Sequence, residues 1–255
     1  MDSMVEMVRG MSLLQALDYC GGYYDCPKDS NGIRMGPLVG YAGKDPTTGK
    51  NLVGDVYANF AKMECWPRVM ELFVGRLWCS LHYLHLPFQP EDIDAFCGAP
   101  MGGLAAAKSL GSIADKRFIY PEKKVTKVAS GSERGESVLI WDRHQPQRDE
   151  KVVLVEDVTN NFSTTGEMID LVLDEGAEVL LILSLLNRSP AGITTFEWRG
   201  VPYPVVSALT KPIPEYKQED PEVASDIAAG KIVWKPKSDA GWARLVAAVK
   251  ASRIS

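Results

Sequence analysis

Residues 152–164 read Val-Val-Leu-Val-Glu-Asp-Val-Thr-Asn-Asn-Phe-Ser-Thr, and this stretch decides the fold class. The four apolar residues at its start predict a short strand that is buried on both faces. Two carboxylates, a loop of hydroxyl and amide side chains, and a predicted helix over residues 165–174 follow. Because two acids at the end of a buried strand are costly without partners, we interpret Glu156 and Asp157 as functional residues. The alternative is an ordinary strand-to-helix turn that happens to be acidic.

Continuous apolar runs on either side of this stretch predict a parallel sheet. Further strands are predicted over residues 93–97, 117–120, 138–141 and 179–185, and helices over residues 63–84 and 104–110. We therefore expect an α/β fold with a central, mostly parallel five-stranded sheet and helices on both faces. Ligands bind such sheets at the carboxyl ends of the strands, so a site is expected in the loops after Cys97 and Val155.

The bulk composition excludes several classes of protein. The net charge of −5 gives no electrostatic reason to expect nucleic-acid or membrane partners, and no apolar run is long enough to span a membrane. The N-terminus shows no secretory signal. The five cysteines are odd in number and form no CxxC pair, which indicates reduced thiols and a cytoplasmic location. The three histidines are too scattered for a metal site, and we interpret His82 and His85 as structural or surface residues.

Two weaker features lie near the expected site. Residues 98–103 contain three glycines at a strand-to-helix turn, which permits close approach of the backbone to a ligand but is also common in ordinary turns. A basic run of Lys123, Lys124 and Lys127 precedes a polar segment, residues 128–136, that contains Gly131 and Gly135. Such a run is usually a solvated surface, but here it borders a segment with almost no apolar anchor.

The stretch at 152–164 resembles the phosphoribosyl-pyrophosphate signature of type I phosphoribosyltransferases. The resemblance implies that the two acids contact the ribose 2′- and 3′-hydroxyls and that the loop cradles the 5′-phosphate. Thr164 and Glu167 form a capping-box pattern that favours a helix start at Thr165, so no insertion is needed; a loop built on residues 164–166 would need four inserted residues. The residues implied to bind phosphoribosyl pyrophosphate are Glu156, Asp157, Val158, Thr159, Asn160, Asn161, Phe162, Ser163, Thr164 and Thr165. Phe162 and Ser163 replace glycines of the family and disfavour positive φ.

The other two features resemble parts of orotate phosphoribosyltransferases. The glycine turn matches the family's pyrophosphate loop, which implies pyrophosphate contacts for Pro100, Met101, Gly102, Gly103 and Lys123. Orotate enzymes usually carry a lysine where Gly102 stands. The basic run resembles their catalytic loop, with Lys124 and Lys127 on catalytic positions alongside Asp157. We call residues 128–136 the lid; Ala129 replaces the family's histidine there. In the family the lid closes over pyrophosphate, commonly across a subunit interface, so a homodimer is implied.

The resemblance also suggests a domain organisation. Residues 91–210 are expected to form the core, and residues 1–90 an N-terminal hood on the side of the base. Residues 211–255 are expected to pack on the core as an extension, with or without a share in the hood. Lys50, Tyr57 and Phe60 resemble the family's base-binding segment.

The resemblance implies a Mg²⁺-dependent enzyme that transfers a phosphoribosyl group to a base, with orotate the first choice. Mg²⁺ would arrive with the substrate, and Asp157 is a candidate ligand. One alternative is a non-catalytic regulator that binds phosphoribosyl pyrophosphate, which the losses at Gly102, Ala129 and Phe162 favour. Another is a phosphoribosyltransferase for a different base.

Overall fold

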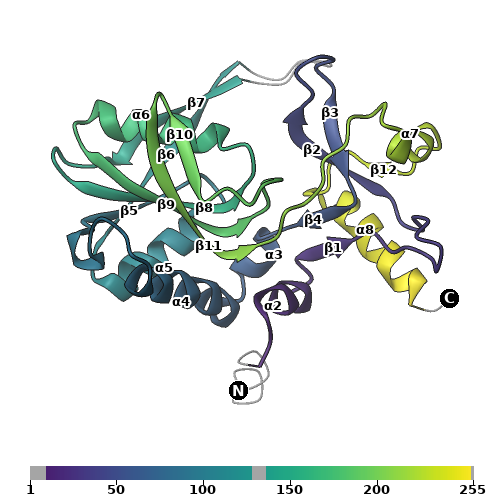
Figure 1. Ribbon diagram of the computed structural model, residues 1–255, viewed down its shortest axis with the longest axis horizontal. Coiled ribbons are helices and arrows are strands. Elements are labelled where there is room, and N and C mark those ends of the chain that lie inside the picture. The colour runs from purple at the N-terminus through teal and green to yellow at the C-terminus, as the bar shows by residue number, and fades with distance from the viewer. Residues whose placement is uncertain (1–9, 128–135, 254–255) are drawn as a thin grey trace. The chain divides into compact units, whose positions relative to one another are not determined.

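The computed structural model describes residues 10–127 and 136–253, which form two compact units (Figure 1). Within the described residues, the first unit contains residues 10–13, 67–127 and 136–211, and the second contains residues 14–66 and 212–253. The second boundary lies within one residue of the predicted one at 210, whereas the first lies at residue 66 instead of 90. The helix α4 (Pro67–Tyr83), expected in the hood, belongs to the first unit.

The first unit is built on a sheet that has seven strands within the described residues, so the predicted number of five is wrong. Their order is β10-β11-β9-β8-β5-β6-β7. The five central strands are parallel, and β7 and β10 are antiparallel to their neighbours at the two edges. The predicted mostly parallel α/β fold is thus confirmed. The strands are β5 (Ala95–Gly98), β6 (Arg117–Lys127), β7 (Glu136–His144), β8 (Lys151–Thr159), β9 (Glu178–Asn187), β10 (Thr195–Trp198) and β11 (Val201–Thr210).

Helices cover both faces of this sheet, as predicted (Figure 1). On one face α4 packs against α5 (Leu104–Ala114), and on the other lies α6 (Ser163–Asp174). Alternation along β8 explains the two layers, because Val152 and Leu154 join a core cluster with Met168 and Ile169 of α6. The carboxyl end of β8 therefore lies between two hydrophobic layers, in the middle of the sheet.

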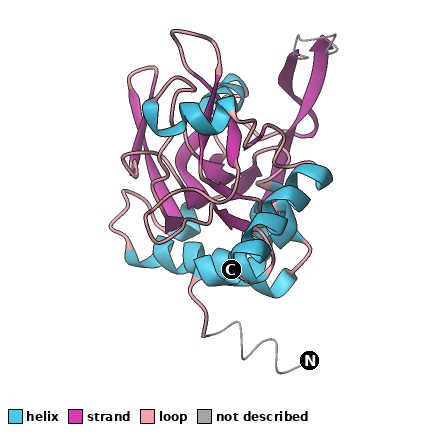
Figure 2. Ribbon diagram, turned by 90° about the vertical axis from the view of Figure 1, so that its right-hand side faces the viewer, coloured by secondary structure: helices cyan, strands magenta, loops and turns pink. Residues whose placement is uncertain are grey.

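Strands β6 and β7 form a hairpin that is longer than predicted. Lys124 pairs with Val138 and Lys127 with Glu136, so pairing continues well beyond the predicted strands at 117–120 and 138–141. Figure 2 shows the two strands as a narrow ribbon at the upper right. Residues 128–135, which make up nearly all of the predicted lid, lie outside the described residues.

The second unit combines the two ends of the chain. Strand β12 (Ile232–Val233) pairs with β2 (Leu38–Lys44), which pairs with β3 (Asn51–Gly54). A second, two-stranded sheet joins β1 (Tyr23–Asp25) to β4 (Val56–Ala58). The helices are α2 (Leu13–Tyr19), α3 (Ala61–Glu64), α7 (Pro221–Ala228) and α8 (Asp239–Ser252).

Residues 212–253 share this unit with the N-terminal strands, which agrees with the alternative in which the C-terminal extension takes part in the hood. The physical reason is the apolar core of the second unit, to which Trp242 and Leu245 of α8 contribute alongside Tyr24, Val39 and Tyr41 of the N-terminal strands. Backbone pairing of β12 with β2 adds to that attachment. The hydrophobic core of residues 14–66 is complete only when side chains of the C-terminal segment pack into it.

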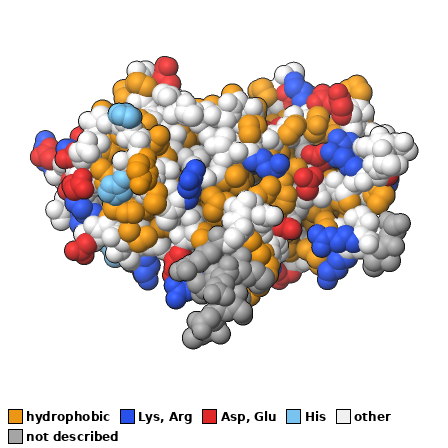
Figure 3. All heavy atoms as spheres, turned by 60° about the horizontal axis from the view of Figure 1, so that its bottom comes forward, with side chains coloured by type: hydrophobic (Ala, Val, Ile, Leu, Met, Phe, Trp, Pro, Cys, Tyr) orange, Lys and Arg blue, Asp and Glu red, His pale blue; other side chains and the backbone are white. Residues whose placement is uncertain are grey.

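The remaining expectations concern membranes, metals and thiols. Among the residues that the structure describes, no helix combines the length and the apolarity that crossing a membrane requires. In the same ranges no three His, Cys, Asp or Glu side chains gather where they could hold a metal ion. All five cysteines are free. His82 and His85 are exposed, and Figure 3 shows histidine side chains among apolar ones on one face of the molecule.

Candidate active site

The two predicted acids lie at the carboxyl edge of the central sheet. Strand β8 is buried from Val152 to Glu156 and lies between β5 and β9. Asp157 is the first partly exposed residue, and the chain then passes through residues 160–162 into α6. The end of β8, the loop after it and the loop after β5 therefore meet at one edge, where ligands bind in open parallel sheets.

Glu156 is buried and accepts a 3.0 Å hydrogen bond at Oε1 from the Thr165 hydroxyl in the first turn of α6. Burial, reinforced by the neighbouring Asp157, raises the pKa of the Glu156 carboxyl from 4.5 to about 8, against opposing effects of the Thr165 hydrogen bond and of Lys123. Burial, with Glu156 nearby, also raises the pKa of the Cys97 thiol. At neutral pH the Glu156 side chain is therefore mostly protonated in the free protein.

Replacing Glu156 with glutamine is expected to remove a pH-dependent cost to stability. The pKa of Glu156 is higher in the folded protein than in the unfolded chain. The contribution of this side chain to the free energy of unfolding is therefore complete below about pH 4.5 and is lost as the pH rises through about 8. A tenfold difference in acidity between the folded and unfolded states is worth about 1.4 kcal/mol. The variant should thus be more stable than the parent above pH 8, by roughly 1–4 kcal/mol.

Urea unfolding between pH 5 and 9 measures this difference. The exposed Glu178→Gln variant of β9 is a matched control and should keep the parent's pH profile. If the free energies of unfolding of the parent and the Glu156→Gln variant changed in parallel over the whole pH range, the raised pKa of Glu156 would be contradicted.

Asp157 lies directly against the glycine loop. Its Oδ1 accepts a 2.8 Å hydrogen bond from the Val158 amide. A Cβ atom added to Gly102 would stand 2.2 Å from the Asp157 Cγ and Oδ2 atoms, far inside van der Waals contact. Position 102 therefore has no space for a side chain while Asp157 keeps this position.

The glycine loop is also fixed to the end of β8. The Ala99 amide donates to the Val155 carbonyl at 2.8 Å, and a Cβ atom at Gly103 would stand 2.0 Å from that same oxygen. The peptide bond between Pro100 and Met101 is cis, and the Met101 side chain is 79% exposed. The structure thus brings the predicted pyrophosphate loop into contact with the predicted ribose-binding acids.

The loop before α6 differs from the predicted capping pattern. The helix begins at Ser163 rather than Thr165, and its N-cap residue is Phe162, which makes no side-chain capping bond. The expected Thr164–Glu167 capping box is therefore wrong. Phe162 instead adopts a left-handed conformation with φ 57°, and its carbonyl accepts the first hydrogen bond of the helix, from the Gly166 amide. The absence of an insertion relative to the family stays a prediction.

The ten residues predicted to bind phosphoribosyl pyrophosphate divide into two groups. Val158 and Thr159 still belong to β8, and the Thr159 hydroxyl is buried against the Ser184 hydroxyl at 3.2 Å. In the loop and first turn, the Asn161 side chain accepts bonds from the amide and hydroxyl of Ser163. Four of the ten residues thus belong to β8, and the other six, residues 160–165, form the loop and the first turn of α6.

The predicted basic residues lie on the hairpin. Lys123 and Lys124 are exposed on β6, and Lys123 is close enough to Glu156 to lower its pKa. Successive residues of a strand point to opposite faces, so the two lysines do not share a direction. Lys127 ends β6. Its role and that of the lid stay predictions.

Comparison with known proteins agrees with this geometry. No protein-family model matches the chain. It is 20% identical over 186 residues, 73% of its length and 92% of the relative's, to an orotate phosphoribosyltransferase of Methanosphaera stadtmanae. A second such relative, from Caldicellulosiruptor bescii, is 24% identical over 78% of this chain and 88% of its own.

The fold of this chain is similar to the folds of solved protein structures. An orotate phosphoribosyltransferase from Aeropyrum pernix superposes with a TM-score of 0.50 at 18% identity, over 78% of this chain and 93% of the other. A UMP synthase of Leishmania donovani gives a TM-score of 0.51 at 14% identity and covers 94% of this chain, which spans 42% of that larger protein. The chain has the fold of the type I phosphoribosyltransferases. Its sequence resembles those of curated orotate phosphoribosyltransferases.

The same edge of the sheet contains one further polar segment, residues 187–189, that the sequence analysis missed. Asn187 ends β9, and its side chain accepts bonds from the amide and hydroxyl of Ser189. Between them, the Arg188 amide donates to the Thr159 carbonyl at 3.0 Å, which places Arg188 beside the end of β8. The signal was available, because this segment follows a predicted buried strand at the same edge of the sheet.

The predicted base-binding residues lie in the second unit. Lys50 is exposed and forms an ion pair with Glu219. Tyr57 is half-buried with its ring centroid 6.2 Å from that of Trp242. Phe60 is only 2% exposed, so stacking on a base would require its ring to be uncovered. Contact of these three residues with a base stays a prediction.

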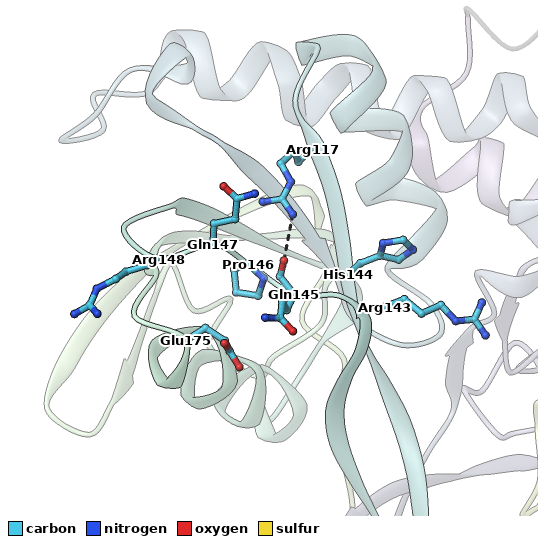
Figure 4. A pocket seen from close by; sticks show the side chains of 8 residues that line it. All are labelled: Arg117, Arg143, His144, Gln145, Pro146, Gln147, Arg148 and Glu175. Carbon is cyan, nitrogen blue, oxygen red and sulfur yellow. Dashed lines mark hydrogen bonds between the residues drawn. The ribbon is translucent and has the colours of Figure 1, made fainter.

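A cavity of about 590 Å³ lies away from these residues, at the amino edge of the sheet (Figure 4). It is lined in part by Arg117, Arg143 and Arg148. Arg117 is paired with Glu150 and donates to the Gln145 carbonyl, and the Arg143 Nε atom is 3.4 Å from Glu122. Figure 4 shows Arg143 and Arg148 pointing in opposite directions. None of the predicted site residues lines this cavity.

Proposed function

We propose that the protein transfers the phosphoribosyl group of 5-phosphoribosyl 1-pyrophosphate to a ring nitrogen of a base, releases pyrophosphate, and uses orotate as that base. The main support is the placement of Glu156 and Asp157 at the sheet edge, between the glycine loop and the loop that begins α6. The alignment with orotate phosphoribosyltransferases over about three quarters of the chain is further support.

The reaction makes clear demands on a site. The bond from ribose C1 to the pyrophosphate oxygen breaks, the bond from C1 to the base nitrogen forms, and C1 becomes cationic in between. Catalysis requires positive charge near pyrophosphate, negative charge near the sugar and a fixed 5′-phosphate. Donor groups of the kind that bind phosphate are available at the N-terminal end of α6, and Asp157 supplies a partly exposed carboxylate beside them.

In this proposal the backbone amides of residues 160–165 hold the 5′-phosphate and Asp157 holds the ribose hydroxyls. Lys124 and Lys127 offset the charge of the leaving pyrophosphate. Arg188, beside the end of β8, would pair with the carboxylate of the base, because guanidinium groups bind carboxylates in a two-pronged geometry. An acidic base such as orotate fits this arrangement better than a neutral one.

Mg²⁺ is part of the same proposal. This ion keeps several waters and binds through one or two carboxylates together with substrate phosphates, and Asp157 offers a carboxylate of that kind. When bound, Mg²⁺ would stabilise the negative charge that builds on pyrophosphate.

We also propose that the protein acts as a homodimer in which each lid serves the partner's site. The support is the resemblance of the basic run on β6 to the family's catalytic loop. Sedimentation equilibrium should give twice the chain mass of 28.0 kDa, and a monomer at the assay concentration would contradict a shared lid.

The free cysteines support a location. All five thiols are unpaired, and two of them, Cys26 and Cys97, are buried. Thiols persist in reducing compartments, so we propose the cytoplasm as the site of action.

One observation favours a second candidate function, that of a non-catalytic regulator. The contact between Gly102 and Asp157 leaves no space for the lysine that orotate enzymes usually carry at this position. A protein without that cation would bind phosphoribosyl pyrophosphate yet transfer it slowly or not at all.

A panel of bases tests both candidates. Purified protein with Mg²⁺ and phosphoribosyl pyrophosphate should release pyrophosphate with orotate, and much less with uracil, adenine or other ring acids. Preference for another base would replace orotate in the proposal. Tight binding of phosphoribosyl pyrophosphate without turnover on any base would establish the regulator instead.

A further inference from the structure

The phosphate loop contains a conformation that its own residues do not favour. Phe162 has φ 57° and ψ 19°, in the left-handed region that glycine adopts easily and a bulky L-residue does not. Its ring is 4% exposed and lies flat on the Phe196 ring of β10, with centroids 4.8 Å apart and planes 13° apart. Contact with a distant strand therefore accompanies the unfavoured backbone state.

The contact extends along α6. Phe196 stacks on Trp198, with centroids 5.9 Å apart. A Cβ atom added to Gly166 would stand 2.7 Å from the Trp198 ring, and Trp198 Nε1 donates to Asp170 Oδ1 at 2.9 Å. Residues 162, 166 and 170 are spaced by four, so the two rings of β10 follow one face of the helix from its N-cap onward.

We propose that Phe196 and Trp198 are positioning residues for the phosphate loop: they hold Phe162 in the left-handed state and so fix the direction of the backbone amides at residues 160–165. This inference rests on the proposed function, in which those amides bind the 5′-phosphate. Without the ring contact Phe162 favours negative φ, and a change of that angle rotates the peptide groups on both sides of it. The aromatic contact thus does the work that a glycine does in the family's usual loop.

The test is the Phe196→Leu variant, which keeps apolar volume but loses the stack. Without any ligand, amide hydrogen exchange in residues 158–166 should become at least several-fold faster than in the parent. The dissociation constant for phosphoribosyl pyrophosphate, measured by calorimetry with Mg²⁺, should rise about three- to thirty-fold. Phe118→Leu is the matched control, because it removes a ring stack with Tyr120 on β6 and should leave both quantities unchanged.

A pair of variants at position 162 separates positioning from simple packing. Phe162→Ala and Phe162→Gly both lose the stack, but only glycine adopts φ 57° unaided. The alanine variant should therefore bind phosphoribosyl pyrophosphate more weakly than the glycine variant, even if both melt at a lower temperature than the parent. Equal affinities of the two variants would overturn the inference. This comparison also decides the question if Phe196→Leu does not fold.

The remaining outcomes are distinct. Unchanged amide exchange at residues 158–166 in the Phe196→Leu variant overturns the inference that the rings hold Phe162 in the left-handed state. Faster exchange with unchanged affinity shows that the loop does not hold the phosphate and overturns the positioning role. A parent that fails to bind phosphoribosyl pyrophosphate refutes the proposed function, while the exchange data, which need no ligand, still decide whether the rings fix the loop.

Discussion

Replacing Asp157 with asparagine is expected to lower kcat/KM for phosphoribosyl transfer by about ten- to a thousand-fold, the range found when a group that stabilises charge in the transition state is removed. Asparagine keeps the shape of the side chain and can still accept the 2.8 Å bond from the Val158 amide, so the contact with Gly102 should persist. The loss would come from the missing negative charge beside the developing cation. Steady-state kinetics with orotate varied at saturating phosphoribosyl pyrophosphate measure it.

The matched control is Asp174→Asn, which neutralises an exposed acid at the other end of α6. Its kinetics should equal the parent's, and circular dichroism should show both variants folded. Unchanged kinetics in a folded Asp157→Asn variant would remove this residue from the site.

Replacing Lys127 with alanine should lower kcat by about ten- to a thousand-fold on the scale of lost charge stabilisation. A lysine that acts only on lid closure stabilises the transition state more than the ground state. Binding of phosphoribosyl pyrophosphate should therefore weaken much less than turnover. The comparison requires kcat and the dissociation constant from the same preparation.

Lys108→Ala, at an exposed position of α5, controls for the loss of a surface charge and should leave both quantities unchanged. Turnover that survives in the Lys127→Ala variant would refute the catalytic assignment of the basic run. Equal losses in turnover and affinity would mean that Lys127 binds the ground state and the transition state alike.

Most of the central sheet could be predicted from sequence because its strands are continuous apolar runs. Strand β8 is the clearest case, with residues 152–155 fully buried. Strand β11 was missed because Pro202 and Pro204 interrupt its start, and proline normally argues against a strand. In the structure these prolines lie opposite residues of the edge strand β10. The parallel pairing of β11 with β9 begins only after them, at Val205.

The positions of the acids and of the glycine loop also followed from local pattern, since the acids end the buried part of β8 and the glycine loop begins at the end of β5. The start of α6 did not. A capping rule reads four consecutive residues, whereas Phe162 is held by Phe196, which is far along the chain and on a strand that was not predicted. The same limit applies to Gly102, because the space that a side chain would take at this position is occupied by the carboxylate of Asp157.

The division into two units was predicted least well. Strands β2 and β12 pair across nearly the whole length of the chain, and the apolar residues of α8 complete a core begun by β1 and β2. Neither segment contains a local sequence pattern that indicates the segment with which it pairs. Local periodicity can identify each element, but the pairing of distant elements depends on which arrangement buries the most apolar surface.

The discontinuous second unit has a consequence for synthesis on the ribosome. Residues 67–211 are continuous and can form their sheet as soon as they emerge, but residues 14–66, made earlier, lack β12 and α8 until residues 212–253 have also been made. At ordinary elongation rates that delay is on the order of tens of seconds. During it the edge of β2 and the apolar side chains of Val39 and Tyr41 are without their final cover. Nascent chains in that state are the ones that chaperones bind, so yield should depend on chaperone supply more strongly than the stability of the finished protein would suggest.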